Sequence, residues 1–236
     1  MKVIDNIALT TALLMGALFA APLYAQTISS LALHYDEVEK NAGVQNMRYL
    51  INQQFMRIDD GNDRADFILY DINKKTIYSV NHDDQTILKI ENNNWTQPVF
   101  KFDVKINQAE LADAPKIQNK TVYTYSVKAG KEVCTSVFLI KDMYTAEMKT
   151  LFEYQQVLSG QQVATLKNTP QELHTPCFLV DQVYHSGDYY KVGLPVKINY
   201  SRDYAKFLKD FKYVESEKEL FKLPEKYQEY KAFEPE

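Results

Sequence analysis

Four histidines are the side chains of this 236-residue chain that titrate closest to neutral pH, and they are the first candidates for metal binding or proton transfer. His34, His82, His174 and His185 are well separated, and none has a second histidine four residues away, the spacing that places two metal ligands on one helix face. His82 is followed by two aspartates, but we expect that cluster to form a solvated turn. The histidines therefore do not predict a metal site.

Two Ser-Gly pairs and one cysteine are the candidates for nucleophilic catalysis. Ser159 and Ser186 each precede a glycine, but they lack the sharp strand-to-helix turn that presents a hydrolase nucleophile. Cys177 with His174 or His185 is a possible thiol and base, although a disulfide would consume that sulfur. We find no catalytic constellation, and we expect a protein that is not an enzyme and needs no cofactor.

The only two cysteines, Cys134 and Cys177, favour a single disulfide, because an even count is typical of a protein in an oxidising compartment. The alternative is two unrelated buried thiols. The bridge would close a loop of about 43 residues and, on the chain-entropy argument, stabilise the fold by about 4 kcal/mol.

An acidic cluster, Asp59, Asp60 and Asp63, could bind calcium, but it lacks the twelve-residue spacing and final glutamate of a calcium hand. With Gly61 and Asn62 between the aspartates, the segment is typical of a turn. We predict a turn here.

Residues 1–25, MKVIDNIALTTALLMGALFAAPLYA, have the pattern of a secretory signal peptide. Lys2 precedes an apolar run from Ile7 to Ala21, which is shorter than the roughly 20 residues needed to cross a bilayer as a helix. We expect cleavage before Gln26, with no lipid anchor and no transmembrane segment. The mature chain, 26–236, should be periplasmic or secreted.

The composition of the chain indicates one aromatic, β-rich domain. A formal net charge of −4, with both signs spread along the chain, does not favour nucleic-acid binding. Only 7 glycines stand beside 17 tyrosines and 12 phenylalanines, which favours a twisted sheet over a glycine-rich phosphate-binding enzyme.

The first half of the mature chain alternates apolar and polar residues with a period of two, as antiparallel strands do. The expected strands are Leu31–Asp36, Met47–Ile51, Phe55–Ile58, Phe67–Asp71, Thr76–Val80, Thr86–Glu91, Phe100–Asn107, Val122–Val127 and Val133–Ile140. Phe100–Asn107 alternates most clearly, which predicts one face on the core and one in water. Ala129-Gly130 predicts a hairpin between the last two strands.

Helical spacing follows. Between Thr145, the expected N-cap, and Gly160, the expected end, apolar residues fall on one helical face. A second helix is expected to start at Pro176 with Thr175 as its cap, and to end at Gly187. The disulfide would then join this helix to the last strand before the first helix.

Alternation resumes after the helices, at Val196, Ile198 and Tyr200, and again after a turn at 201–203, in Phe207, Lys209, Phe211 and Tyr213. The segment Glu215–Glu236 is charged but punctuated by apolar residues. We expect it to pack on the outside of the domain.

Two segments carry a family resemblance. The stretch RYLINQQFMRIDDGNDRADFILYDINKKTIYSVNHDDQTILKIE resembles a pattern of the periplasmic lipoprotein-carrier (LolA-like) superfamily, at Met56–Asp59, Leu69–Asp71 and Thr76–Tyr78. The later stretch Tyr189–Tyr227 resembles the closing half of bacterial members, at Gly193-Leu194-Pro195 and Phe221–Pro224.

The resemblance implies an α+β fold: a strongly curved antiparallel sheet, or unclosed β-barrel, with two or more helices covering its concave face. It also implies a binding role, with a lipid, an acylated protein or another apolar ligand as partner, but it transfers no ligand contact to a residue of this chain. The alternative is a structural or protein-interaction module of the cell envelope with a filled core, which uses a strand edge or the aromatic tail, Tyr227, Tyr230 and Phe233. A continuous apolar cavity would favour the first function.

Overall fold

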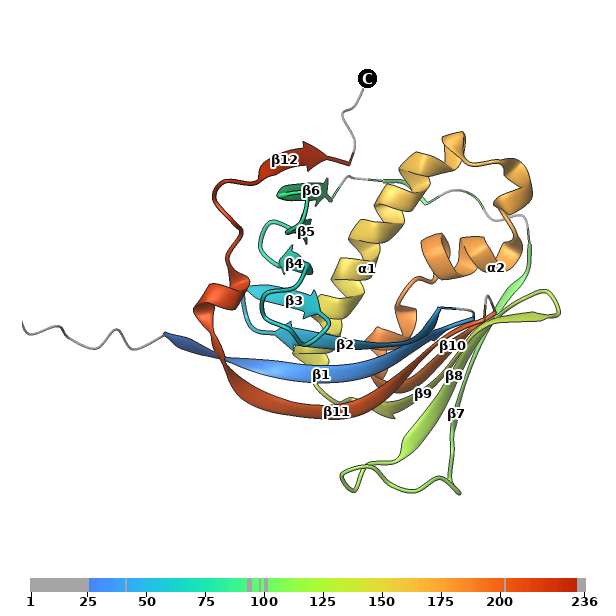
Figure 1. Cartoon of the computed structure of the whole chain (residues 1–236). Helices are drawn as coiled ribbons and strands as arrows, with labels where there is room; N and C mark the ends of the chain where they lie inside the picture. The colour runs from blue at the N-terminus through green and yellow to red at the C-terminus, as the bar shows by residue number, and fades with distance from the viewer. Residues whose placement is uncertain are drawn as a thin grey trace, which may run out of the picture.

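The computed structural model describes residues 26–40, 42–92, 95–97, 99, 102–201 and 203–232. The expected signal peptide, residues 1–25, lies outside the described residues, as do Phe100 and Phe233. The described chain forms one mixed sheet of 12 strands and two α-helices, which confirms the expected α+β class (Figure 1).

The strands and helices have the following bounds: β1 Thr27–Glu39, β2 Gly43–Ile51, β3 Phe55–Asp59, β4 Phe67–Asp71, β5 Thr76–Asn81, β6 Thr86–Glu91, β7 Val104–Glu110, β8 Val122–Ala129, β9 Glu132–Lys141, α1 Thr145–Thr165, α2 Pro176–Leu179, β10 Gly193–Tyr200, β11 Tyr204–Glu217 and β12 Gln228–Lys231. A π-helical segment, η3 Val180–Tyr184, continues α2, and 3-10 turns occur at Leu166–Asn168, Gln171–Leu173, Asp188–Lys191 and Lys218–Phe221.

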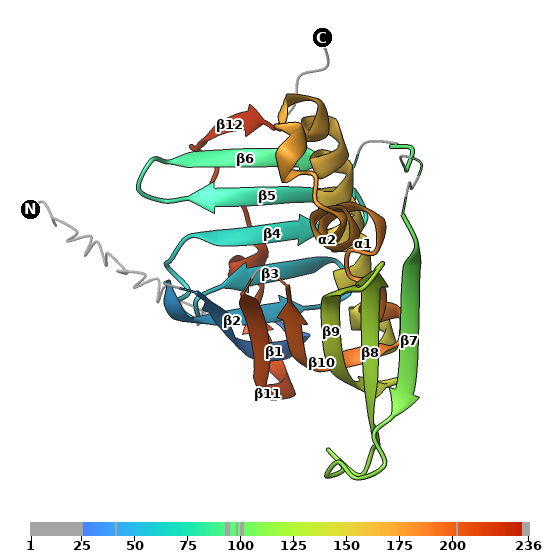
Figure 2. The ribbon, with the colours of Figure 1, turned by 90° about the vertical axis from the view of Figure 1, so that its right-hand side faces the viewer.

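In the sheet, the first described strand, β1, lies near the middle and the last, β12, lies at one edge. Its strand order is β12-β6-β5-β4-β3-β2-β1-β11-β10-β9-β8-β7, and all pairs are antiparallel except β12 with β6. Figure 2 shows β2 to β6 on one side, β7 to β9 on the other, and α1 and α2 between them. The sheet is therefore unclosed and curved, as the family resemblance implied.

Two apolar cores lie on opposite faces of the sheet, because strand residues alternate between the faces. The inner core combines Leu31, Leu33 and Ile51 from the strands with Met148 and Leu151 from α1. The outer core contains neighbours of those strand residues, among them Ala32 and Leu50, and also Phe221 from the chain after β11. The segment after β11 thus packs on the outside of the sheet, as expected.

Helix α1 is longer than predicted. It begins at Thr145, but its N-cap residue is Tyr144, which has a left-handed backbone and makes no side-chain cap. It then continues through Gly160 to Thr165, so the expected end at Gly160 was wrong. The reason is tertiary: a Cβ on Gly160 would lie 2.5 Å from Trp95 Cδ1, so glycine at this position makes room for the indole ring.

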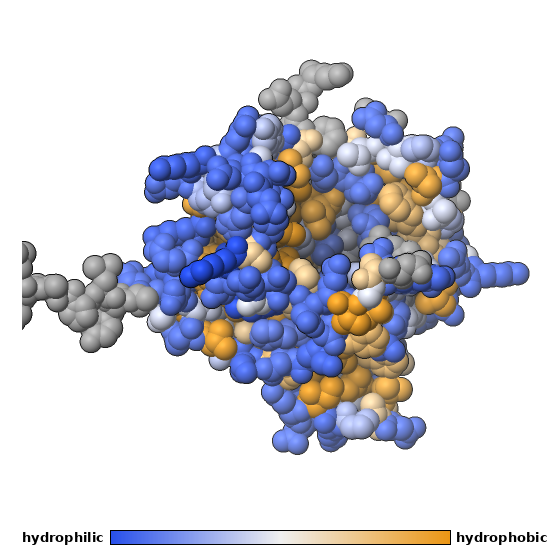
Figure 3. Space-filling model, in the orientation of Figure 1, coloured by the Kyte–Doolittle hydropathy of each residue, from blue (hydrophilic) through white to orange (hydrophobic). Residues whose placement is uncertain are grey.

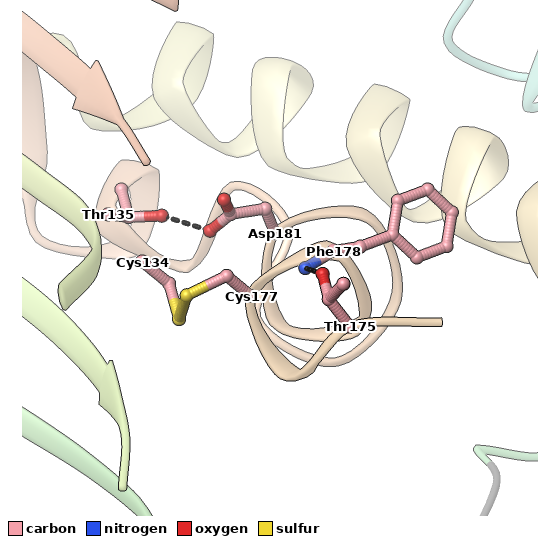
Figure 4. Close-up of a disulfide and its surroundings, with 6 residues drawn as sticks. All are labelled: Cys134, Thr135, Thr175, Cys177, Phe178 and Asp181. Atoms are coloured by element: carbon pink, nitrogen blue, oxygen red, sulfur yellow. Dashed lines mark hydrogen bonds between the residues drawn. A yellow bond between two sulfur atoms is a disulfide. The ribbon is translucent and has the colours of Figure 1, made fainter. Parts of the chain in front are cut away.

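The second helix starts as predicted, with the Thr175 hydroxyl accepting a hydrogen bond from Phe178 N and Pro176 in the first turn. It does not run regularly to Gly187, because α2 ends at Leu179 and the chain continues as the π-helical segment η3. The predicted disulfide between Cys134 and Cys177 is present and joins α2 to β9 (Figure 4).

The strand predicted from Phe100 to Asn107 was partly wrong. The described strand, β7, starts at Val104 and ends at Glu110, and it lies at the edge of the sheet. Phe102 and Val104 pack against the inner core, as the alternation predicted. From Lys105 onward the strand is exposed, and Ile106, expected on the core face, is 44% exposed.

No helix in the described ranges has the length and apolar character needed to span a membrane.

Candidate functional site

A group of largely buried polar side chains on the inner face surrounds an ion pair between β1 and β11. Glu37 and Lys206 are direct partners in the antiparallel register, and Lys206 Nζ lies 2.6 Å from Glu37 Oε1. Their side chains are only 13% and 15% exposed. Two opposite charges directly across a strand pair are a favourable arrangement, and here the pair is largely shielded from water.

Two tyrosines complete this ion pair. The Tyr49 hydroxyl donates to Glu37 Oε1 at 3.0 Å and accepts from Lys206 Nζ at 2.9 Å. The Tyr204 hydroxyl donates to the other carboxylate oxygen of Glu37. Both charges are thus hydrogen-bonded as well as paired, the condition under which a buried ion pair is tolerated.

A bulge in the pairing of β1 with β11 places Lys206 at this position. His34 pairs with Asp210 but Tyr35 pairs with Leu208, so Lys209 is an extra residue on β11. Because of it, Lys206 lies on the same face as Phe211, although the two are an odd number of residues apart. The predicted alternation through Phe207, Lys209, Phe211 and Tyr213 is therefore broken at the bulge, which places Phe207 and Phe211 on opposite faces.

The charges in the cluster fix its protonation states near neutral pH. Burial opposes ionisation of Glu37, but the Lys206 ammonium and the hydrogen bonds from Lys206, Tyr204 and Tyr49 outweigh it and hold the pKa of Glu37 below its usual range. Burial also opposes the charge on Lys206, yet Tyr49 and Glu37 raise its pKa well above the usual value. The lysine is a firmly protonated ammonium.

Further tyrosines extend the polar cluster into the inner core. The Tyr35 hydroxyl donates to the carbonyl of Pro195 at 2.8 Å, and the hydroxyls of Tyr189 and Tyr200 are 2.8 Å apart. Burial raises the pKa of Tyr35 and Tyr189 well above the usual value, and raises that of Tyr154 to about 12. The hydroxyls of Tyr35, Tyr154 and Tyr189 are therefore neutral hydrogen-bonding groups at any physiological pH.

A pocket of about 440 Å³ opens beside the ion pair. We call it the inner pocket; it is lined by Glu37, Glu39, Met47, Tyr49, Ile58, Ile68, Tyr154, Gln155, Leu158, Asp181, Gln182, Tyr200, Tyr204 and Lys206. Its volume lies in the range of small-molecule binding pockets. The lining is therefore half apolar and half polar, and neither the continuous apolar cavity nor the completely filled core of the sequence-based alternatives describes it.

A second hollow, of about 560 Å³, adjoins the inner pocket across Met47, Ile58 and Ile68, which line both. It continues past these three side chains toward the ends of β4 and β5. Figure 3 shows that the surface over β4 to β6 is mainly hydrophilic, with hydrophobic residues visible in the hollow between those strands and the helices. An elongated molecule could thus lie across an apolar floor with one end at the ion pair.

One wall of the inner pocket is held by the disulfide. Asp181 and Gln182 of η3 line the pocket, and η3 directly continues α2, which carries Cys177. The Thr135 hydroxyl, next to Cys134 on β9, donates to the Asp181 carboxyl (Figure 4). The disulfide and this hydrogen bond thus both attach the continuous segment of α2 and η3 to β9.

The residues weighed as catalytic or metal-binding candidates are not brought together. His34 lies in β1, His82 in the turn after β5, His174 before α2, and His185 after η3, where it contacts Asp188 at 2.8 Å. In the described part of the chain, no three His, Cys, Asp or Glu side chains are grouped as metal ligands. Ser159 lies within α1, and the Cys177 sulfur is consumed by the disulfide.

The acidic cluster forms the predicted turn, but its first residue has a second role. Asp59 is buried at the end of β3 on the outer face, where Arg48 donates to both of its oxygens at 2.8 Å and Arg57 Nε donates at 2.6 Å. Burial opposes ionisation of Asp59, but Arg48, Arg57 and the amide of Gly61 keep its pKa below the usual range. Two guanidinium groups therefore occupy the carboxylate.

The inner-pocket residues Glu37, Tyr49, Tyr204 and Lys206 were not singled out from the sequence. Each stands at an unremarkable position in an alternating strand, and no spacing links β1 or β2 to β11. The one signal in the sequence was an acidic residue in one strand and a basic residue in another, which could form a buried ion pair. To recognise that pair, one must already know the register of β1 with β11 and the position of the bulge.

The comparisons with known proteins leave the family open. No protein-family model matches the sequence, and no curated protein does. Among solved structures, PNGF-II aligns with a TM-score of 0.42 at 8% identity, over 86% of this chain and 31% of that one. An uncharacterised conserved protein from Thermus thermophilus aligns with a TM-score of 0.42 at 9% identity, over 86% of this chain and 90% of that one.

This chain thus spans about a third of the length of PNGF-II, since the alignment covers 31% of that chain. Both likenesses are too low to carry an argument about function. We therefore infer the function from the inner pocket.

Proposed function

We propose that this protein binds an amphipathic molecule of the lipid class in the inner pocket. The observation that carries the proposal is the lining of that pocket, in which the apolar side chains of Met47, Ile58 and Ile68 lie next to a buried ion pair. Ligand pockets typically combine apolar walls with a few fixed polar groups. An apolar chain would lie over the first and a polar head group beside the second.

In this proposal the helices cover the concave face and form the walls of the site. Helix α1 supplies Tyr154 and Leu158 to the pocket, and η3 supplies Asp181 and Gln182. The resemblance of Met56–Asp59 and Gly193-Leu194-Pro195 to the LolA-like superfamily supports the same arrangement. An acylated protein would enter such a pocket by its acyl chain.

We further propose that the protein is exported to the periplasm or secreted. The support is the signal-peptide pattern of residues 1–25 together with the disulfide, since disulfides persist in oxidising compartments. A lipid-class ligand would then be met in or near the cell envelope.

The proposed role is non-catalytic. The amine of Lys206 is the one strong nucleophile type in the lining, and Glu37 and Tyr49 keep it protonated, which removes its lone pair. The buried tyrosines are neutral for the reason given above. These groups can orient a ligand by hydrogen bonds.

The test is native mass spectrometry of the protein purified without detergent from cells that express the full chain. We expect a bound organic molecule that organic solvent extracts, and we expect the stripped protein to take up decyl maltoside below its critical micelle concentration. Met47→Trp, which fills the half-buried apolar floor, should abolish both, whereas Ile106→Trp at the exposed edge strand should not.

Clean protein that takes up no decyl maltoside would remove the proposal and favour an interaction module. For that alternative, part of the aromatic tail is already engaged within the molecule, because the Tyr227 hydroxyl lies 2.8 Å from His82 Nδ1 and β12 pairs with β6. Tyr230 remains 47% exposed.

A further inference from the structure

The charges around the inner pocket are unequal. Three carboxyl side chains line it, from Glu37, Glu39 and Asp181, against a single basic side chain, Lys206. A ligand pocket with an excess of one sign of charge raises the local concentration of the opposite sign. The charge count alone thus disfavours an anionic head group.

The single lysine is also not free to receive an anion. Its ammonium group lies 2.6 Å from Glu37 and donates to Tyr49 at 2.9 Å. An incoming carboxylate or phosphate would have to compete with Glu37 for that ammonium, and displacing Glu37 would leave a carboxylate largely buried without its partner, which is strongly unfavourable.

Aromatic rings supply the second half of the recognition. Four of the lining residues are tyrosines, Tyr49, Tyr154, Tyr200 and Tyr204, and the rings of Tyr200 and Tyr204 stack with centroids 5.7 Å apart. The ammonium of Lys206 already lies 5.5 Å from the Tyr49 ring and 5.7 Å from the Tyr204 ring. Tyrosine faces together with carboxylates are the groups that bind ammonium ligands in other proteins.

We propose that the inner pocket selects amphiphiles with a positively charged amine head group. The inference rests on the proposed function, because it requires an amphiphile in this pocket. The apolar chain lies on Met47, Ile58 and Ile68, and the head group lies among the tyrosines on the side of the exposed Glu39 carboxylate. Lys206 stays paired with Glu37 and sets the inner limit of the head-group site.

Three probes with the same decyl chain test the inference: decyltrimethylammonium, decyl maltoside and decanoate, each titrated calorimetrically into stripped protein below its critical micelle concentration. We expect the dissociation constant of decyltrimethylammonium to be at least about tenfold lower than that of decanoate, with decyl maltoside between them. Because Glu39 is exposed, the preference should weaken as salt is added.

Glu39→Gln provides the matched variant, because this residue ends β1 and its side chain is exposed, so the change should leave the fold intact. We expect it to weaken decyltrimethylammonium binding about threefold more than it weakens decyl maltoside binding. Glu132→Gln, an exposed carboxylate outside the pocket lining, serves as the control and should change neither.

The outcomes separate the two proposals. Decanoate binding as tightly as decyltrimethylammonium, or an ammonium preference that survives Glu39→Gln unchanged, would overturn the head-group inference while leaving the amphiphile pocket in place. No binding by any of the three probes would remove the proposed function, and the inference with it.

Discussion

At the scale of single residues, the ion pair of Glu37 and Lys206 connects stability to the proposed site. Both side chains are largely buried. Removing one partner therefore leaves the other charge buried without its counter-charge, whereas removing both partners leaves no buried charge. The bulge at Lys209 is what brings Lys206 to this face. A single extra residue in β11 therefore decides the polarity of the inner pocket.

Glu37→Gln should lower the free energy of unfolding by about 3 kcal/mol at neutral pH, because it leaves the Lys206 ammonium unpaired. The double variant Glu37→Met with Lys206→Met should be more stable than Glu37→Gln, because it leaves no buried charge. It should still lose about 1 kcal/mol or more relative to the unchanged protein, because the Tyr49 and Tyr204 hydroxyls lose the hydrogen bonds that they make to this pair. Urea unfolding followed by circular dichroism measures both. A single variant as stable as the unchanged protein would contradict the buried pair.

The same residue predicts a pH dependence. The pKa of Glu37 is lower in the folded protein than its ordinary value of about 4.3, so its contribution is complete above that pH and is lost as the pH falls through the lower folded-state pKa. The loss of stability below about pH 4 should therefore be smaller in Glu37→Gln than in the unchanged protein. Equal slopes in unfolding free energies measured against pH would argue against this assignment.

Gly160 gives a second prediction at this scale. Alanine favours a helix interior over glycine by about 1 kcal/mol, but a Cβ here would overlap Trp95, and overpacking typically costs about 1–3 kcal/mol. Gly160→Ala should therefore be neutral or destabilising, and it should shift the emission of Trp95, the only tryptophan, to longer wavelength. Gln161→Ala, at the next position of α1, serves as the control and should leave the emission unchanged.

At the scale of elements, the disulfide attaches a short irregular segment to the sheet. Helix α2 has only four residues, and η3 is a π-helical turn, so neither is stable by itself. Cys134–Cys177 and the hydrogen bond from Thr135 to Asp181 hold them against β9. The wall of the inner pocket therefore depends on this attachment.

Replacing both cysteines by alanine should destabilise the protein by about 4 kcal/mol on the chain-entropy argument for a 43-residue separation. Hydrogen exchange should increase most in Pro176–Tyr184, and uptake of decyl maltoside should weaken because Asp181 and Gln182 line the pocket. Uniform faster exchange throughout the chain, with unchanged exchange ranking, would show that the bridge does not act on this wall in particular.

The segment after β11 is a second short, irregular segment that is attached to the sheet. Phe221 is 5% exposed, its ring stacks on Phe55 with centroids 6.3 Å apart, and the carbonyl of Leu220 accepts from Arg57 at 2.8 Å. The segment closes the outer core.

Phe221→Ala should accordingly lower the free energy of unfolding by about 3 kcal/mol, the usual cost of removing a buried aromatic ring. Tyr230→Ala, at a position that is 47% exposed in β12, should change it by less than about 1 kcal/mol. Thermal unfolding of the two variants makes the comparison, and equal losses would mean that the segment does not contribute through its buried ring.

At the scale of the whole molecule, the strand order sets which parts are held most firmly. β1 and β11 lie in the middle of the sheet, and each has a neighbour on both sides. β7 lies at one end and is mostly exposed. Local opening needs less free energy where fewer apolar contacts are broken.

Amide exchange in the native protein should therefore be slowest in Leu31–Tyr35 of β1 and at least about a hundredfold faster along β7. Mass spectrometry of peptic fragments after deuterium labelling gives the ranking. Protection of β7 equal to that of β1 would indicate that a further chain pairs with this edge in solution.

Most strands and the start of α2 could be predicted from the sequence, and the start of α1 to within one residue, because alternation, turn residues and the Thr175-Pro176 cap act over a few neighbouring residues. The pairing of Cys134 with Cys177 also followed, since two cysteines allow one bridge. The end of α1 did not follow, because the reason for Gly160 is a ring from a distant segment.

The inner pocket was decided only by the tertiary structure. Glu37, Tyr49 and Lys206 meet because β1 pairs with β2 on one side and with β11 on the other, and because a bulge reverses the alternation within β11. Local sequence determines the conformation of a segment through short-range steric and hydrogen-bonding preferences. Which segments become neighbours depends on burial summed over the whole sheet, and the chemistry of this site arises from those neighbours.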